Sequence, residues 1–407
     1  MNYINEDKLI LEKEVFTREE IEKRMKNGGF NSLAKFELYV WDLEMFLQFQ
    51  KILQDKIILK GGAATQFYIP ITGQRTSIDI DMICLASREE VHQSLRQVED
   101  EFNGEGEYCK FRLYEPRNPK VGLGMLETYY VTIPSICDAK ELYATKGRQE
   151  VKIEFLFLNG KYEIDKIRHP ELFALETEKE FNILNILYLF ADKLTTLGPK
   201  TIGIPEERAD EQFKQIYDVI TLFTSNMDQI VKNREILKAK YEYVAKIECE
   251  IHNIAYDEKN LFADMKSIIN KVKQIENDPT LLQNANDFQS LYLRNIVSRD
   301  KAQWAIVGFQ LDMLVEYIFR EDERVLVFRE TEELIDYLNF LNLRGPEKAK
   351  RLKVVRTSLE DHFSDILGLT IGLFKKRLER IVWELSTYVS LDKIKKVIET
   401  GICDLSE

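Results

Sequence analysis

The sequence predicts an α+β fold, with a small mixed sheet in its first half and only helices in its second half. Every strand candidate lies before about residue 160, and only helical patterns follow residue 226. The chain has 407 residues, of which 44% are hydrophobic and 31% charged, as expected for a globular protein of two or three domains. We expect an N-terminal helical segment over 1–56, a mixed core over 57–224 and a helical domain over 225–407.

The first predicted elements are two helices and a short strand. The run "TREE" at 17–20 fits a capping box, in which the Thr17 and Glu20 side chains would each bind the other's backbone amide. Apolar residues at helical spacing predict a longer helix over 33–53. The apolar run at 57–59 predicts a strand that ends at the pair Gly61 and Gly62.

The following elements complete the mixed core. A short helix over 63–68 should end before Pro70, because proline cannot continue a helix. The run "VKIEFLFL" at 151–158 is the clearest strand in the chain. The other predicted elements are strands over 76–85, 110–114 and 129–133, and helices over 88–102, 182–197 and 209–223. Later helices should be separated at 277–280 and 345–346.

Composition narrows the class of function. The net charge of −12 and the pI near 5.2 disfavour a protein that coats nucleic acid or anionic membrane by bulk electrostatics. Five scattered cysteines without a C-x-x-C pair are typical of reduced thiols, and four dispersed histidines show no zinc-ligand spacing. An acidic N-terminal segment and the lack of an apolar run of about 18 residues predict a cytoplasmic protein without a membrane span.

Asp79 and Asp81 form the first candidate site. Residues two apart on a strand face the same side, so both carboxylates should point into one site, where two Mg²⁺ ions about 4 Å apart could bind. Their repulsion is costly unless a cation lies between them. The alternative is a solvated edge strand, which the apolar residues Ile78, Ile80 and Met82 disfavour.

Two further features adjoin this pair. Gly61 and Gly62 lie at a strand-to-helix turn, where glycine lets the backbone approach a phosphate, although an ordinary loop is the alternative. Neither the Rossmann nor the Walker glycine pattern is present. Glu154 is a third carboxylate on an apolar strand, where a shared metal or a surface position would each account for its charge.

The ordered motifs resemble the nucleotidyltransferase core of the AbiEii/AbiGii toxin family, whose fold is related to DNA polymerase β. The resemblance rests on "LKGGAATQFYI" from residue 59, "RTSIDID" at 75–81, "ADKLTTL" at 191–197 and "KQIYDV" at 214–219. It covers roughly residues 59–222 and leaves the helical half outside. The chain departs from the family pattern at Ala63, Glu154 and Gln215. The first departure would weaken one hydrogen bond to phosphate, and none of the three removes the metal site.

The resemblance implies roles for individual residues. It implies that Lys193 contacts phosphate and offsets developing negative charge, and that Asp218 orients Lys193 or acts as a base. Glu154 would activate the acceptor hydroxyl. By the same resemblance Mg²⁺, with Mn²⁺ as an alternative, would bind Asp79, Asp81 and Glu154, and the NTP would bind Lys60, Gly61, Gly62, Arg75, Ser77 and Lys193.

Simpler interpretations exist for two of these residues. Lys193 could extend its ammonium group to solvent from an apolar helix. Asp218 could pair with Lys214, its neighbour one helical turn earlier.

The resemblance implies a Mg²⁺-dependent toxin of a toxin–antitoxin or phage-abortive-infection system, with a cognate antitoxin as partner. It would transfer NMP from NTP to tRNA or to a protein. The basic clusters at 344–356 and 375–380 are candidate RNA contacts, or else solvated helix faces. The alternatives are an antibiotic-type nucleotidyltransferase that modifies a small molecule, and an inactive nucleotide-binding regulator.

Overall fold

The computed structural model describes residues 4–103, 109–115, 123–137, 149–340 and 345–403. By its internal contacts the chain divides into two compact units. The first comprises Met1–Leu261 and Asn284–Ser298, and the second Phe262–Gln283 and Arg299–Glu407. The domain limits expected after residues 56 and 224 stay predictions. The first unit extends to residue 261 because α8 (Arg234–Ile251) packs against α5 (Ile186–Thr195).

The first unit is built on a seven-stranded mixed sheet in the order β3-β4-β5-β2-β1-β7-β6. Its strands are β1 (Ile57–Lys60), β2 (Asp79–Cys84), β3 (Phe111–Leu113), β4 (Leu126–Ile133), β5 (Gln149–Phe157), β6 (Ile164–Ile167) and β7 (Phe181–Leu184). β2 lies between β5 and β1, so it is an inner strand of the sheet. The interpretation of β2 as a solvated edge strand was therefore wrong.

The register of the inner strands aligns the charged residues of the motifs. β1 and β2 are antiparallel with Lys60 opposite Asp81. β2 and β5 are parallel with Asp81 opposite Glu154. Residues paired across neighbouring strands point to the same face of the sheet. Ile80 and Met82 alternate with the aspartates and are fully buried, as their apolar character predicts.

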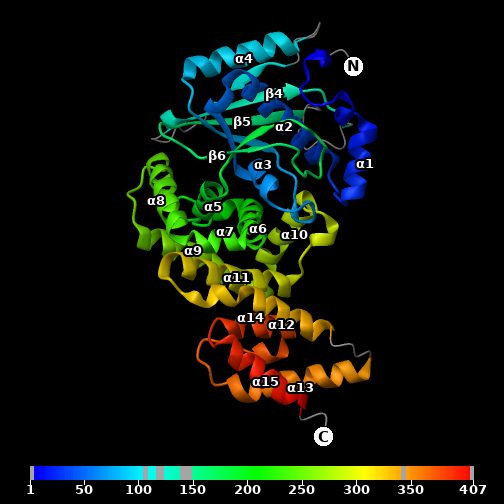
Figure 1. The fold of residues 1–407 in the computed structure, drawn as a ribbon, viewed down its shortest axis with the longest axis vertical. Helices are drawn as coiled ribbons and strands as arrows, with labels where there is room; N and C mark the ends of the chain where they lie inside the picture. Colours follow the sequence, from blue (N-terminus) through cyan, green and yellow to red (C-terminus); the bar gives the residue numbers. More distant parts are fainter. Residues whose placement is uncertain (1–3, 104–108, 116–122, 138–148, 341–344, 404–407) are drawn as a thin grey trace. The chain divides into compact units, whose positions relative to one another are not determined.

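Helices of the first unit cover the sheet and frame the glycine turn. α2 (Leu33–Leu53) packs against β1, β2 and β5, and α4 (Arg88–Phe102) packs against α2. α3 (Gly61–Thr65) follows β1 directly and contacts β2, α5 and α6 (Ala209–Ser225) (Figure 1). The other α-helices of this unit are α1 (Arg18–Gly28) and α7 (Met227–Lys232).

Three local predictions need correction. Residues 181–184 form β7 rather than the start of a helix, because Asn185 caps α5 by accepting the Leu187 amide. Thr17 does accept the Glu20 amide, but the Glu20 carboxylate binds Lys23 and Arg24 instead of completing a capping box. β2 begins at Asp79 rather than at residue 76. Arg75 and Ser77 therefore precede the strand.

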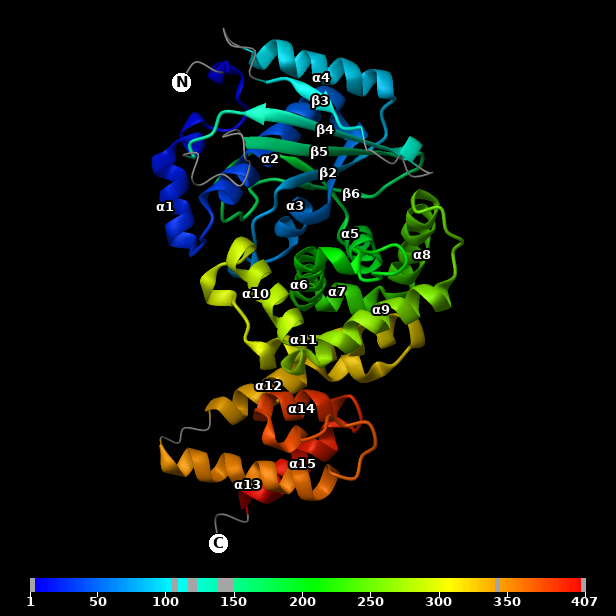
Figure 2. The ribbon, with the colours of Figure 1, turned by 180° about the vertical axis from the view of Figure 1, so that it is seen from behind.

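The second unit contains only helices among its described residues, as predicted. The division between the units falls within two helices, α9 (Glu258–Lys273) and α10 (Pro279–Tyr292), each of which has residues in both units. The others are α11 (Lys301–Arg320), α12 (Phe328–Phe340), α13 (Pro346–Phe363), α14 (Leu378–Ser386) and α15 (Leu391–Cys403). α13 packs beside α15, and α11 beside α14 (Figure 2). Pro279 and Pro346 begin helices at the predicted breaks. Within the described residues, no helix is long and apolar enough to cross a membrane.

Candidate active site

The glycine turn is packed directly against the aspartate motif. Gly61 has a φ of +70°, which glycine adopts without a steric penalty. A Cβ atom at Gly61 would overlap with the Asp81 carboxylate and lie 2.9 Å from the Asp81 Cβ. A Cβ atom at Gly62 would lie 2.9 Å from both Ser77 Oγ and Arg75 Nη2. Gly61 therefore allows a contact with Asp81 that a Cβ atom would block, and at Gly62 a Cβ atom would require the Ser77 and Arg75 side chains to shift.

Carboxylates gather on this part of the sheet. Burial, the charge of Glu154 and a hydrogen bond shared with Glu154 raise the pKa of Asp81 to about 6, against the opposing effect of Lys152 and Lys60. Glu154 Oε1 lies 2.8 Å from Lys152 Nζ and accepts a hydrogen bond of 3.2 Å from Thr128 Oγ1. The interpretation of Glu154 as a plain surface residue is therefore incomplete, because its charge takes part in this cluster.

Two carboxylates near this cluster were not predicted. Asp42 on α2 is 1% exposed, and neither of its oxygens has a hydrogen-bond partner among the described residues. Burial and the charges of Asp79 and Asp81 raise the pKa of Asp42 well above its usual value. Glu248 on α8 has a pKa raised by burial to about 7, with Lys60 opposing.

The carboxylates fit a divalent cation, with a limited ligand set. Among the described residues, no group of three or more His, Cys, Asp or Glu side chains is arranged to hold a metal ion. Asp79 and Asp81, both on β2, are thus a candidate pair of ligands, and Glu154 is engaged by Lys152. A raised pKa at Asp81 is the electrostatic sign of a carboxylate group in need of a counter-charge. A cation that also binds substrate oxygens would meet that need.

A buried ion-pair network holds Arg75 and Lys193 at one carboxylate. Arg75 donates two hydrogen bonds of 2.7 Å to the two oxygens of Asp218. Lys193 Nζ lies 2.8 Å from Asp218 Oδ2 and donates to Gln215 Oε1 at 2.9 Å. Burial favours a higher pKa at Asp218, but Arg75 and Lys193 outweigh it and lower the pKa below the ordinary value. Lys193 is therefore an internal cation rather than a side chain that extends to solvent.

The remaining predicted residues lie at this turn. Lys60 Nζ forms an ion pair of 2.8 Å with Asp192 Oδ1, so its charge is already balanced. Ala63, where the family has Thr or Ser, is fully buried. Thr76 binds the Tyr292 carbonyl oxygen through its amide at 3.1 Å, which fixes the segment between Arg75 and Ser77. The structure thus brings the predicted residues of β1, β2, α3, α5 and α6 together around one turn.

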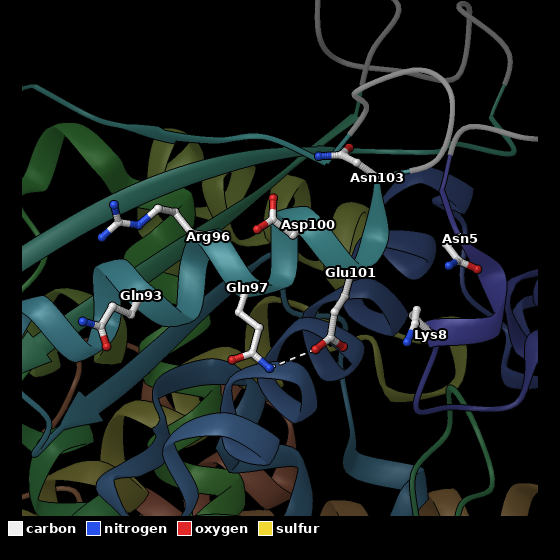
Figure 3. A pocket seen from close by; sticks show the side chains of 8 residues that line it. All are labelled: Asn5, Lys8, Gln93, Arg96, Gln97, Asp100, Glu101 and Asn103. Atoms are coloured by element: carbon white, nitrogen blue, oxygen red, sulfur yellow. Dashed lines mark hydrogen bonds between the residues drawn. The ribbon is translucent and has the colours of Figure 1, made fainter.

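A surface pocket along α4 has different chemistry. Figure 3 shows polar side chains along this helix, with Gln97 donating a hydrogen bond of 2.9 Å to Glu101. Its lining combines the cations Lys8 and Arg96 with acidic and amide groups. It contains neither the glycine turn nor the paired aspartates, so it is not the candidate active site.

The two basic clusters differ in exposure. On α13, Lys350 and Lys353 are exposed. In the second cluster, Arg380 is fully buried against Glu384, and Lys376 pairs with Glu276 at 3.1 Å. The expectation that 375–380 forms an open basic surface was therefore wrong at Arg380, because that charge is used inside the unit.

Comparisons with known proteins identify the family of the chain. The model of the AbiEii family, described as a nucleotidyl transferase toxin of type IV toxin–antitoxin systems, matches residues 47–300. No match was found among curated proteins.

Two solved structures resemble the chain distantly. MenT4, a nucleotidyltransferase toxin from Mycobacterium tuberculosis, is 11% identical with a TM-score of 0.40, over 74% of this chain and 97% of that one. A putative nucleotidyltransferase from H. pylori is 13% identical with a TM-score of 0.34, over 77% and 99%. Both likenesses are too distant to inform on mechanism. Because the family model matches more than half of the chain, this protein belongs to the AbiEii family of nucleotidyltransferase toxins.

Proposed function

We propose that this nucleotidyltransferase transfers NMP from an NTP to an RNA acceptor, tRNA, in a reaction that requires Mg²⁺. The observation that carries the proposal is the glycine turn in contact with both Asp81 and Ser77. A tight backbone turn beside paired carboxylates suits a metal-bound triphosphate. The acceptor oxygen would bond to the α-phosphorus while the bond to the β-phosphate oxygen breaks and pyrophosphate leaves.

Asp79 and Asp81 are proposed to hold the metal. When bound, Mg²⁺ (or Mn²⁺) supplies charge neutralisation on the phosphate oxygens. Glu154 is proposed as the third carboxylate, which takes the proton of the acceptor hydroxyl. Its contact with Lys152 at 2.8 Å would orient the carboxylate for this step.

The phosphates are proposed to lie against the glycine turn. Gly61, Gly62 and Ser77 would face the triphosphate, with Lys60 beside them. Arg75 and Lys193 would place positive charge at the phosphates. Asp218 suits an orienting role better than a base, because both of its oxygens accept from cations and its pKa is lowered.

The proposal that RNA is the acceptor rests on the exposed basic residues of α13. Lys350 and Lys353 stand on an otherwise acidic chain, where local cations are needed for contact with a phosphate backbone. A protein acceptor would not need them. We propose that the protein acts in the cytoplasm as a toxin that a cognate antitoxin counteracts. Its biological role would be defence against phage by abortive infection.

The test is transfer of label from each of the four α-³²P NTPs to separated RNA and protein fractions with Mg²⁺. We expect a labelled tRNA band with one or more NTPs, and at least a hundredfold loss in the variant with Asp79→Ala and Asp81→Ala. Equal labelling by that variant would contradict the metal assignment. Label in the protein fraction alone would replace RNA with a protein acceptor.

A further inference from the structure

Lys214 is a buried cation that the proposed mechanism does not use. It lies on α6, one helical turn before Asp218, and is 9% exposed. The spacing favours an ion pair between the two. Instead, Asp218 is occupied by Arg75 and Lys193 at 2.7 and 2.8 Å. Lys214 forms no ion pair or hydrogen bond with any residue that the structure describes. The interpretation that Asp218 pairs with Lys214 was therefore wrong.

The surroundings of Lys214 carry an excess of positive charge. Its Nζ lies 4.9 Å from the centre of the Tyr292 ring, a contact that stabilises a cation only modestly. Burial lowers the pKa of Lys214 and the charge of Arg75 lowers it further, while Asp79 acts in the opposite direction. Arg75 and Lys193 both bind Asp218, whereas Asp79 and Glu211 act on Lys214 only through space, so Lys214 has no carboxylate at ion-pair distance among the described residues. A buried cation without a counter-charge is costly, and a bound anion would remove that cost.

The neighbours of this charge indicate which anion it suits. Arg75 and Ser77 both lie close to Gly62 at the glycine turn. Tyr292, whose ring Lys214 contacts, accepts the Thr76 amide between them, and Asp79 of the proposed metal pair acts on Lys214 electrostatically. The excess charge therefore lies beside the proposed phosphate site. A lysine ammonium is a compact point charge that suits a terminal phosphate better than a planar carboxylate. Pyrophosphate and the β- and γ-phosphates of an NTP have this chemistry, whereas the one phosphate of a nucleoside monophosphate would occupy the α-position and leave Lys214 without a partner.

We propose that Lys214 is a second phosphate-binding lysine, which contacts the β- and γ-phosphates of the NTP and the pyrophosphate that leaves. This proposal rests on the proposed function. As the acceptor oxygen bonds to the α-phosphorus, the electron pair of the breaking bond stays on pyrophosphate. The Lys214 ammonium offsets that charge without transferring a proton.

The first test compares binding by Lys214→Met and Lys214→Arg with the wild-type protein in calorimetry with Mg²⁺. We expect Lys214→Met to weaken binding of NTP and of pyrophosphate about ten- to a hundredfold, and Lys214→Arg to weaken it less. Binding of NMP should stay unchanged. Wild-type affinity of Lys214→Met for pyrophosphate would overturn the proposal.

Lys240→Met is the matched control. Lys240 is 7% exposed and also lies over a tyrosine ring, 3.7 Å from the centre of Tyr188. Its charge is already balanced by Glu163 at 2.7 Å. Its removal should change pyrophosphate affinity by less than about twofold, although it deletes an equally buried lysine.

A second test needs no variant, and it decides the matter if Lys214→Met does not fold. Acetylation of Lys214 in the wild-type protein, read by mass spectrometry, should fall when Mg²⁺ and pyrophosphate are added, but not with NMP. No acetylation in the free protein, or equal acetylation in both states, would contradict the proposal. A protein that binds pyrophosphate through Lys214 but transfers no nucleotide would refute the proposed function alone.

Discussion

Replacement of Gly61 by alanine tests the contact between the glycine turn and Asp81. At a φ of +70° an alanine costs about 1–2 kcal/mol of folding free energy. The new Cβ would in addition overlap with the Asp81 carboxylate, so either the turn or Asp81 must move. Displacement of Asp81, a proposed metal ligand, by about 1 Å can cost about a hundredfold in rate. We therefore expect Gly61→Ala to lose both stability and at least that factor of nucleotide transfer.

Gly372→Ala separates backbone strain from this overlap. Gly372 has nearly the same φ, +73°, and no atom lies within 4 Å of the position of its Cβ among the described residues. It should lose the same 1–2 kcal/mol or so of stability while keeping full transfer. Thermal unfolding and initial rates with labelled NTP measure both quantities. If Gly61→Ala matched Gly372→Ala in both, the turn would not be packed tightly against Asp81 and our description of the site would be refuted.

Two further variants probe buried charge. Above pH 4 the native wild-type protein keeps a proton on Asp42 that the unfolded chain has lost, so the wild type loses stability as the pH rises. Asp42→Asn avoids this loss, and its free energy of unfolding should exceed that of the wild type by up to about 1.4 kcal/mol more per pH unit until the raised native pKa is passed. Urea titrations at pH 4, 5.5 and 7 measure this difference, and a constant difference would contradict the prediction. Asp218→Asn leaves two buried cations without a counter-charge and should lower the free energy of unfolding by about 3–5 kcal/mol. As a control, Glu242→Gln breaks an exposed pair with Lys246 and should lower it by less than about 1 kcal/mol. Equal losses in the two variants would show that the buried network does not depend on Asp218.

Most elements with a clear periodicity were predictable from the sequence. The helix over 33–53 and the helix over 88–102 have the predicted bounds, since both carry sustained apolar patterns. β7 was missed because its three apolar residues, Phe181, Ile183 and Leu184, lie directly before the apolar α5. Only the capping of α5 by Asn185 separates the two, and a short apolar run does not reveal a strand on its own.

The sequence indicated the candidate site where its residues are close along the chain. The glycine pair and the aspartate motif lie within 21 residues, and their types already indicate phosphate and metal chemistry. The partner of Asp218 was not predictable, because Arg75 is 143 positions away in the sequence and helical spacing favoured Lys214 instead. Asp42 is hidden for the same reason. It sits in an apolar helix pattern, and only the packing of α2 on the sheet places its charge near Asp79 and Asp81.

Parallel reactions with α-³²P and γ-³²P NTP test the central claim most directly. A nucleotidyltransferase leaves the α-phosphate on the acceptor and releases the γ-phosphate in pyrophosphate. We predict that RNA is labelled only from the α-³²P NTP, with one pyrophosphate released for each nucleotide transferred. Label on the acceptor from the γ-³²P NTP would indicate phosphoryl transfer, and it would contradict the account of the site given above.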